Sequence, residues 1–168
     1  MKTNGRSVEV LRLSTKTIAE NAIIACIYAV LTLAIAPLAY SEVQFRISEI
    51  IVFLAFYNKK WIPGLVIGCF LANLGSPLGW FDLVFGTFST LLVCVCMNKV
   101  KNRYLAALCG AVITGILVGY ELHLAFGIPF WLNAFYVGLG EGAVLIIGAV
   151  IFGYIERNRR LKAILQEG

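Results

Sequence analysis

Long apolar segments alternate with short polar ones along most of this chain. Charged and turn residues delimit six apolar segments, at 17–37, 45–57, 61–74, 80–97, 104–122 and 130–155. An apolar segment of about twenty residues predicts a helix that crosses a membrane. The segments 45–57 and 61–74 are shorter and predict two short helices. The expected fold is therefore all-α, an integral membrane bundle of six transmembrane helices.

The composition supports a membrane location for most of the chain. Of its 168 residues 60% are hydrophobic and 14% are charged, and the mean hydropathy is +0.87. Soluble domains carry about 25% charged residues, so this balance indicates an integral membrane protein. We expect a cytoplasmic arm at 1–16, a membrane domain at 17–155 and a basic cytoplasmic tail at 156–168.

The basic residues mark one side of the membrane. All 14 Lys and Arg except Arg46 fall in four clusters, within 2–16, 59–60, 99–103 and 157–162. Short loops rich in Lys and Arg face the cytoplasm, so both termini are predicted to be cytoplasmic, with the protein in the cell membrane. The net charge of +5 then indicates this topology and an attraction to anionic lipid, and no nucleic-acid partner is expected.

Residues that hold metals or perform covalent chemistry are sparse. Each of the 5 Cys lies in an apolar segment without paired spacing, which is typical of small buried helix residues. Cys94 and Cys96 are two positions apart and point to different helix faces, so no metal site is expected there. His123 is the single His and lacks the partners of a catalytic group. With no phosphate-binding loop either, we expect no enzyme, no cofactor and no ATPase of its own.

Polar side chains gather at the end of the bundle opposite the basic clusters. A charged group inside a bilayer is unfavourable by about 3 kcal/mol, so this gathering predicts a ligand or ion site. Glu141 lies about two turns deeper than Asn133 and is expected to form the floor of an outward-facing pocket. The candidate binding residues are Gln44, Arg46, Glu49, Asn73, Trp80, Asp82, Asn133, Tyr136 and Glu141, with Glu42, Phe45, Glu121 and His123 as further candidates.

The balance of these groups predicts the chemistry of the ligand. Carboxylates outnumber the single Arg, so the ligand is expected to supply hydrogen-bond donors or positive charge. The aromatic residues offer flat surfaces for stacking on a ring or holding an ammonium. A structural alternative stays open, in which Arg46 pairs with one carboxylate, Asp82 caps the fourth helix, and Glu121 and His123 meet water.

Small residues recur at spacings that let helices approach closely. Glycines four positions apart occur at 64 and 68, 115 and 119, and 138 and 142, while Ala22, Ala25 and Ala29 form a strip on the first helix. Such strips serve close packing inside one chain or against a second membrane protein. The spacing alone does not distinguish the two.

Several sequence runs carry a resemblance to a known family. They are QFRISE at 44–49, PG at 63–64, LANL at 71–74, GWFDLVFGT at 79–87 and NAFYVGLGE at 133–141. Through them the chain resembles the QueT family over roughly residues 18–155. That family comprises substrate-binding S components of energy-coupling factor (ECF) transporters, assigned to queuosine precursors.

The resemblance implies a fold, partners and a cargo. It implies six helices with both termini in the cytoplasm, a pocket capped by the first outer loop, and a shared module of one membrane coupling protein and two ATPases. Ala22, Ala25 and Ala29 would contact the coupling protein. The implied cargo is a 7-deazaguanine such as 7-aminomethyl-7-deazaguanine, whose ring donors and ammonium suit carboxylates. The expected contacts are Glu141 or Glu49 with the guanine-like edge, Asp82 or Glu42 with the ammonium, Arg46, Asn73 or Asn133 with O6, and Trp80 or Tyr136 stacked on the ring.

Two other classes of protein remain alternatives. One is a self-sufficient proton-coupled carrier, in which Glu49 or Glu141 relays the proton. The other is a non-transport membrane assembly subunit, in which the polar groups pair with one another.

Overall fold

The structure, a computed structural model, describes residues 14–39 and 45–166. Every regular element in these ranges is helical, which confirms the all-α prediction. Glu42, Gln44 and most of the N-terminal arm lie outside the described residues. The elements are α1 (Thr15–Ala34), α2 (Ala36–Ala39), η1 (Ile47–Val52), α3 (Phe53–Tyr57), η2 (Lys59–Trp61), α4 (Ile62–Asn73), η3 (Asp82–Gly86), α5 (Thr87–Lys99), α6 (Arg103–Phe126), α7 (Phe130–Ile155) and α8 (Arg159–Gln166).

Four helical stretches of the described chain are long and apolar enough to cross a membrane. They are Thr15–Ala34, Asp82–Lys99, Arg103–Phe126 and Phe130–Ile155. The predicted short elements are also present, as the apolar stretch Ile47–Tyr57 and as α4, which has 12 residues. A helix of that length reaches about 18 Å, well below the roughly 30 Å of a hydrocarbon core.

The short stretch Ile47–Tyr57 lies inside the bundle. Its parts η1 and α3 contact α1, α5 and α7. Val52, Phe53 and Ala55 are fully buried in the main apolar core. Because long helices surround this stretch, its polar residues are held away from lipid. The charged residue Glu49 thus lies in the interior of the helix bundle.

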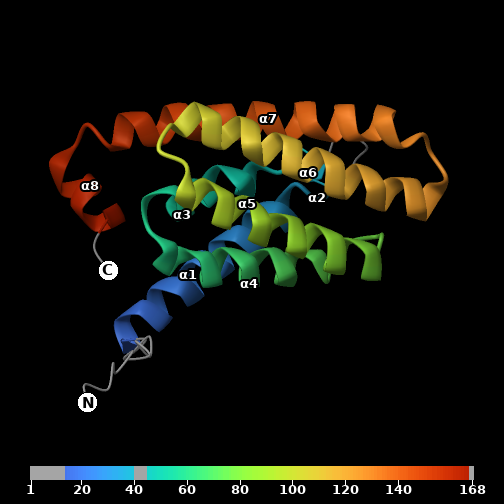
Figure 1. Cartoon of the computed structure of the whole chain (residues 1–168). Helices are drawn as coiled ribbons and strands as arrows, with labels where there is room; N and C mark the ends of the chain where they lie inside the picture. Colours follow the sequence, from blue (N-terminus) through green and yellow to red (C-terminus); the bar gives the residue numbers. More distant parts are fainter. Residues whose placement is uncertain (1–13, 40–44, 167–168) are drawn as a thin grey trace, which may run out of the picture.

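Close helix contacts form where the glycine spacing predicted them. α6 and α7 lie side by side along most of their length (Figure 1). A Cβ atom at Gly119 would come within 2.7 Å of the backbone nitrogen of Ala134, so only glycine permits this approach. Gly68 of α4 similarly lies against the backbone of Ala25 in α1. A Cβ atom added at Gly68 would lie 2.9 Å from the carbonyl oxygen of Ala25.

The small-residue strip of α1, Ala22, Ala25 and Ala29, is partly buried and partly exposed. Ala25 and Ala29 are buried, and Ala25 packs against α4. Ala22 is exposed. Of the three residues predicted to contact a partner, Ala22 alone presents its side chain outward.

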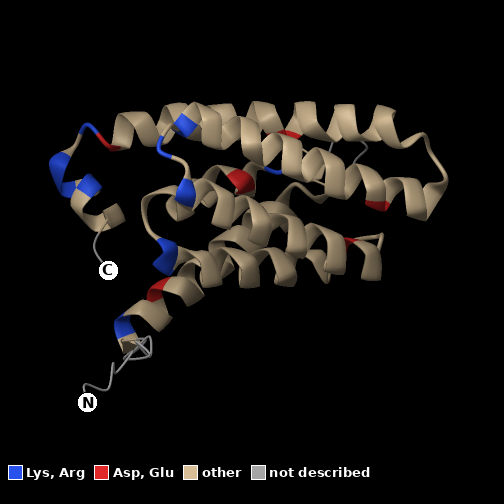
Figure 2. Cartoon of the chain, in the orientation of Figure 1, with Lys and Arg blue, Asp and Glu red and all other residues tan. Residues whose placement is uncertain are grey.

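Apart from the buried Arg46, the basic residues of the described chain gather at the end of the bundle where α1 and α4 begin, α5 ends, α6 begins and α8 lies (Figure 2). The segment after α7, which the charge pattern marked as a tail, includes the helix α8. Leu165 of α8 is buried, and its carbonyl accepts a hydrogen bond from Trp61 Nε1 at 3.2 Å. Asn58 Nδ2 donates to the carbonyl of Gln166 at 3.1 Å, so α8 packs back onto the connection between α3 and α4.

Candidate functional site

A buried ion pair lies at the end of the bundle opposite α8. Arg46, just before η1, places its Nη2 3.2 Å from Oδ1 of Asp82 at the start of η3. Both side chains are buried. Arg46 Nε also donates to the carbonyl of Ala39 at 3.3 Å, and the Ser76 hydroxyl donates to Oδ2 of Asp82. The pairing of Arg46 with a carboxylate, the structural alternative from the sequence, is present in this state of the protein.

Glu49 accepts a hydrogen bond from the first helix, α1. It is buried in η1, and the hydroxyl of Tyr28 in α1 donates to its Oε1. One turn along the same face, Thr32 Oγ1 and Ser48 Oγ lie 2.6 Å apart and share a hydrogen bond. Polar side chains thus connect α1 to the charged segment at two successive turns.

Tyr28 and Thr32 were not among the residues predicted for this region. They occupy the same helix face as Ala25 and Ala29, four positions apart from each other. Hydroxyl residues are ordinary in apolar helices because they can bond to the carbonyl of the preceding turn, as Thr32 does to Tyr28 at 3.0 Å. The sequence therefore carries no signal that separates them from structural hydroxyls.

Several buried polar side-chain atoms of α4, α6 and α7 have no hydrogen-bond partner among the described residues. They are Glu121 Oε1 and Oε2, Glu141 Oε1, Asn133 Nδ2 and Asn73 Oδ1. Folded proteins satisfy about nine in ten buried polar atoms, so a concentration of unsatisfied ones calls for an explanation. Four of the five atoms are acceptors and three of these belong to carboxylates. The arrangement suits a ligand that carries hydrogen-bond donors.

Glu141 and Arg46 line a small cavity inside the bundle. Its volume is about 10 Å³, and its lining residues are Arg46, Glu49, Gly86, Ser89, Thr90, Thr114, Val118 and Glu141. That volume accommodates roughly one water molecule. A site that encloses a small organic ligand needs about 300 Å³ or more. The predicted outward-facing pocket is therefore closed here to anything larger than water.

The structure brings most of the predicted polar candidates together. Arg46, Glu49 and Glu141 line one cavity. Asn73 Nδ2 donates to the backbone carbonyl of Asp82 at 2.9 Å. Glu121 is buried within electrostatic reach of Asp82 and Arg46, although the sequence offered it only as a further candidate. Asn133 is buried on the face of α7 that carries Glu141, two turns away.

The aromatic and imidazole candidates lie outside this cluster. Trp80 is 79% exposed and Tyr136 is 45% exposed. Phe45 is half-buried beside Arg46 in the sequence. His123 is exposed, and its Nδ1 lies 2.7 Å from the carbonyl oxygen of Ile128 in the turn between α6 and α7. In this closed arrangement no indole or phenol of Trp80 or Tyr136 reaches the buried carboxylates.

Fold and site together define an α-helical membrane protein with an ionisable cluster enclosed by its spanning helices, an arrangement typical of transporters. The sequence model of the family described as QueT transporter matches residues 18–157, and this chain belongs to that family. The resemblance found in the sequence runs is thereby confirmed. The "Queuosine precursor transporter QueT" of Lactococcus lactis subsp. cremoris (strain MG1363) is 34% identical over 153 residues, which is 82% of this chain and 90% of that relative. No solved structure matches the chain significantly.

Proposed function

We propose that this protein is the substrate-binding S component of an ECF-type importer and captures a queuosine precursor from outside the cell. The proposed cargo is a 7-deazaguanine such as 7-aminomethyl-7-deazaguanine. The observation that carries this proposal is the excess of buried acceptors over donors around Arg46. The described residues place four carboxylates there, those of Glu49, Asp82, Glu121 and Glu141.

The unsatisfied atoms match the functional groups of such a ligand. The N1–H and exocyclic amine of a guanine-like ring are donors, and the aminomethyl group is a cation. Glu141 would accept from the ring edge, and Asn133 Nδ2 would donate to O6. Asp82 is already paired with Arg46 and Ser76, so Glu121 is the better placed partner for the ammonium.

Ligand entry requires the cluster to open. The cavity of about 10 Å³ is far below the size of a deazapurine site. Its wall combines η1 and η3 with α5, α6 and α7, so at least one of these elements must move outward. The described arrangement of these elements is therefore a closed one.

The proposal also covers topology and energy coupling. We propose six crossings with both termini in the cytoplasm, and the basic clusters at one end of the bundle support this orientation. Energy would come from a coupling module of one membrane protein and two ATPases. Ala22, the exposed member of the α1 strip, is our candidate contact with that module.

Two measurements test these statements. Calorimetry of the purified chain with aminomethyl, nitrile and unsubstituted 7-deazaguanines, and with adenine, should show binding of the deazaguanines alone. Uptake into vesicles should require the ATPase module together with this chain. Uptake by this chain alone along a proton gradient would instead establish the proton-coupled carrier. Absence of binding by every 7-deazapurine would overturn the cargo assignment.

A further inference from the structure

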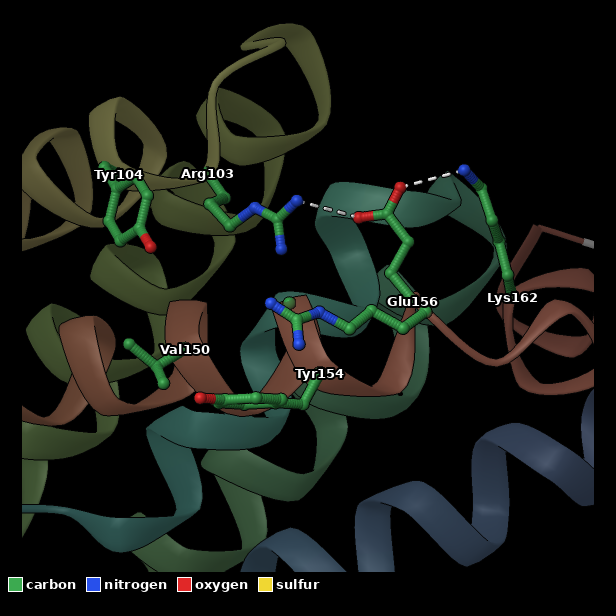
Figure 3. Close-up of a pocket in the computed structure, with 8 residues that line it drawn as sticks. Arg103, Tyr104, Val150, Tyr154, Glu156 and Lys162 are labelled. Atoms are coloured by element: carbon green, nitrogen blue, oxygen red, sulfur yellow. Dashed lines mark hydrogen bonds and ion pairs between the residues drawn. The ribbon is translucent and has the colours of Figure 1, made fainter.

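A second hollow lies at the opposite end of the molecule, and it includes no residue of the buried cluster. Its volume is about 520 Å³, and it lies where α6 begins, α7 ends and α8 follows (Figure 3). The lining residues are Arg103, Tyr104, Val150, Gly153, Tyr154, Glu156, Arg157 and Lys162. The proposed transport function makes no use of it.

Ion pairs connect the three helix ends around this hollow. Glu156 Oε2 lies 3.0 Å from Arg103 Nη2 at the start of α6, and Oε1 lies 2.9 Å from Lys162 Nζ of α8. Gly153 of α7 leaves room for the guanidinium in the first of these contacts. An added Cβ there would collide with Nη1 of Arg103, so the absent side chain lets the guanidinium cross α7.

The hollow retains positive charge after these pairs have formed. Its three cations, Arg103, Arg157 and Lys162, face one carboxylate, that of Glu156, which leaves an excess of two positive charges. Arg157 lies over the ring of Tyr154 at 4.8 Å and forms no ion pair among the described residues. A compact anion with several acceptor oxygens, such as a phosphate group, complements this arrangement.

The surroundings of the hollow suit a phosphate group that belongs to a lipid. Val150 lines the hollow, and one turn away on α7 Ile146 is 54% exposed. On α6, Leu108 lies one turn beyond Tyr104 and is 60% exposed. Tyr104 and Tyr154 are themselves exposed, as tyrosines at a membrane interface are. A phosphate bound here would therefore direct attached acyl chains along apolar helix faces.

We infer that the hollow between α6, α7 and α8 binds the headgroup of an anionic phospholipid. Basic pockets between membrane helices bind such headgroups in general, and attraction to an anionic surface amounts to about 1 kcal/mol for each Lys or Arg. The bound lipid would link the end of α7 to α8 and stabilise the docking of α8.

Thermal unfolding of the full chain in a neutral detergent tests this inference. The chain is titrated with phosphatidylglycerol, with phosphatidylcholine of the same acyl chains, and with inorganic phosphate. We expect phosphatidylglycerol to raise the unfolding temperature in a saturable way, because ligands of the native state stabilise it. Equal stabilisation by phosphatidylcholine, or by inorganic phosphate, would overturn the assignment to an anionic lipid.

Three variants separate a built site from diffuse attraction. Arg157→Gln removes an unpaired cation and should raise the half-saturating phosphatidylglycerol concentration about fivefold. Gly153→Ala displaces the Arg103 guanidinium without changing the charge and should also weaken binding. Arg160→Gln, the control, removes an exposed cation of α8 that does not line the hollow, and should leave the titration unchanged. Equal weakening by Arg157→Gln and Arg160→Gln, with Gly153→Ala unaltered, would contradict the proposal.

Discussion

Two Arg–carboxylate pairs, one at each end of the bundle, differ in their surroundings far more than in their geometry. Arg46 and Asp82 are separated by 3.2 Å, with 6% and 0% of their side chains exposed. Arg103 and Glu156 are separated by 3.0 Å, with 30% and 25% exposed. Water screens the second pair and contributes little to the first. Similar distances therefore imply different energies, and only the buried pair is surrounded by unsatisfied acceptors.

The largest expected effect is on stability, when the arginine of the buried pair is removed and the result is compared with removal of the arginine of the exposed pair. Arg46→Ala leaves Asp82 buried without its cation and should lower the free energy of unfolding by about 3–5 kcal/mol. Arg103→Ala leaves Glu156 with Lys162 and solvent, and should lower it by at most about 1 kcal/mol. Denaturant titration in detergent micelles, followed by circular dichroism, measures both. Equal losses would show that burial does not distinguish the two ends.

The next effect concerns the ligand. Glu141→Gln keeps the size of the side chain but removes its charge, and should weaken binding of 7-aminomethyl-7-deazaguanine by about 1–3 kcal/mol. Glu20→Gln provides the control, since Glu20 pairs with Lys16 and Lys60 at the basic end. Calorimetry should show no change for the control. Unchanged affinity in Glu141→Gln would remove Glu141 from the binding site.

Removal of one hydroxyl should have a smaller effect than the loss of Arg46, and it tests the link between α1 and the buried cluster. Tyr28→Phe deletes the donor to Glu49 and leaves a buried acceptor unsatisfied, which should lower the free energy of unfolding by about 1–3 kcal/mol. Tyr136→Phe makes the same change at an exposed position and should be neutral within about 0.5 kcal/mol. A neutral Tyr28→Phe would mean that the hydroxyl does not support Glu49.

The sequence predicts the two ends unequally well. Charges inside apolar runs identify Glu49 and Glu141 as buried, because only the protein interior can accept them there. The outward exposure of Tyr136 could not be predicted, since it depends on how α7 is rotated against its neighbours. α8 was missed because its charges conceal Leu165, whose burial requires the tertiary contact with Trp61.

The smallest expected effect is a pH dependence of the unfolding temperature that comes from Glu156, at the end of the bundle where the basic residues gather. The hydrogen bond from Lys162, together with the charges of Lys162 and Arg103, lowers the pKa of Glu156 in the folded protein. Partial burial of the carboxyl acts in the opposite direction but does not cancel this lowering. A lowered folded pKa stabilises the fold above the unfolded value of about 4.3 and ceases to do so as the pH falls through the folded value. Wild type should therefore exceed Glu156→Gln in unfolding temperature at pH 7, and the difference should shrink as the pH falls below about 4.3 towards the lowered folded value. A difference that stayed the same throughout acidification would mean that packing, and not the charge of Glu156, holds α8 against α7.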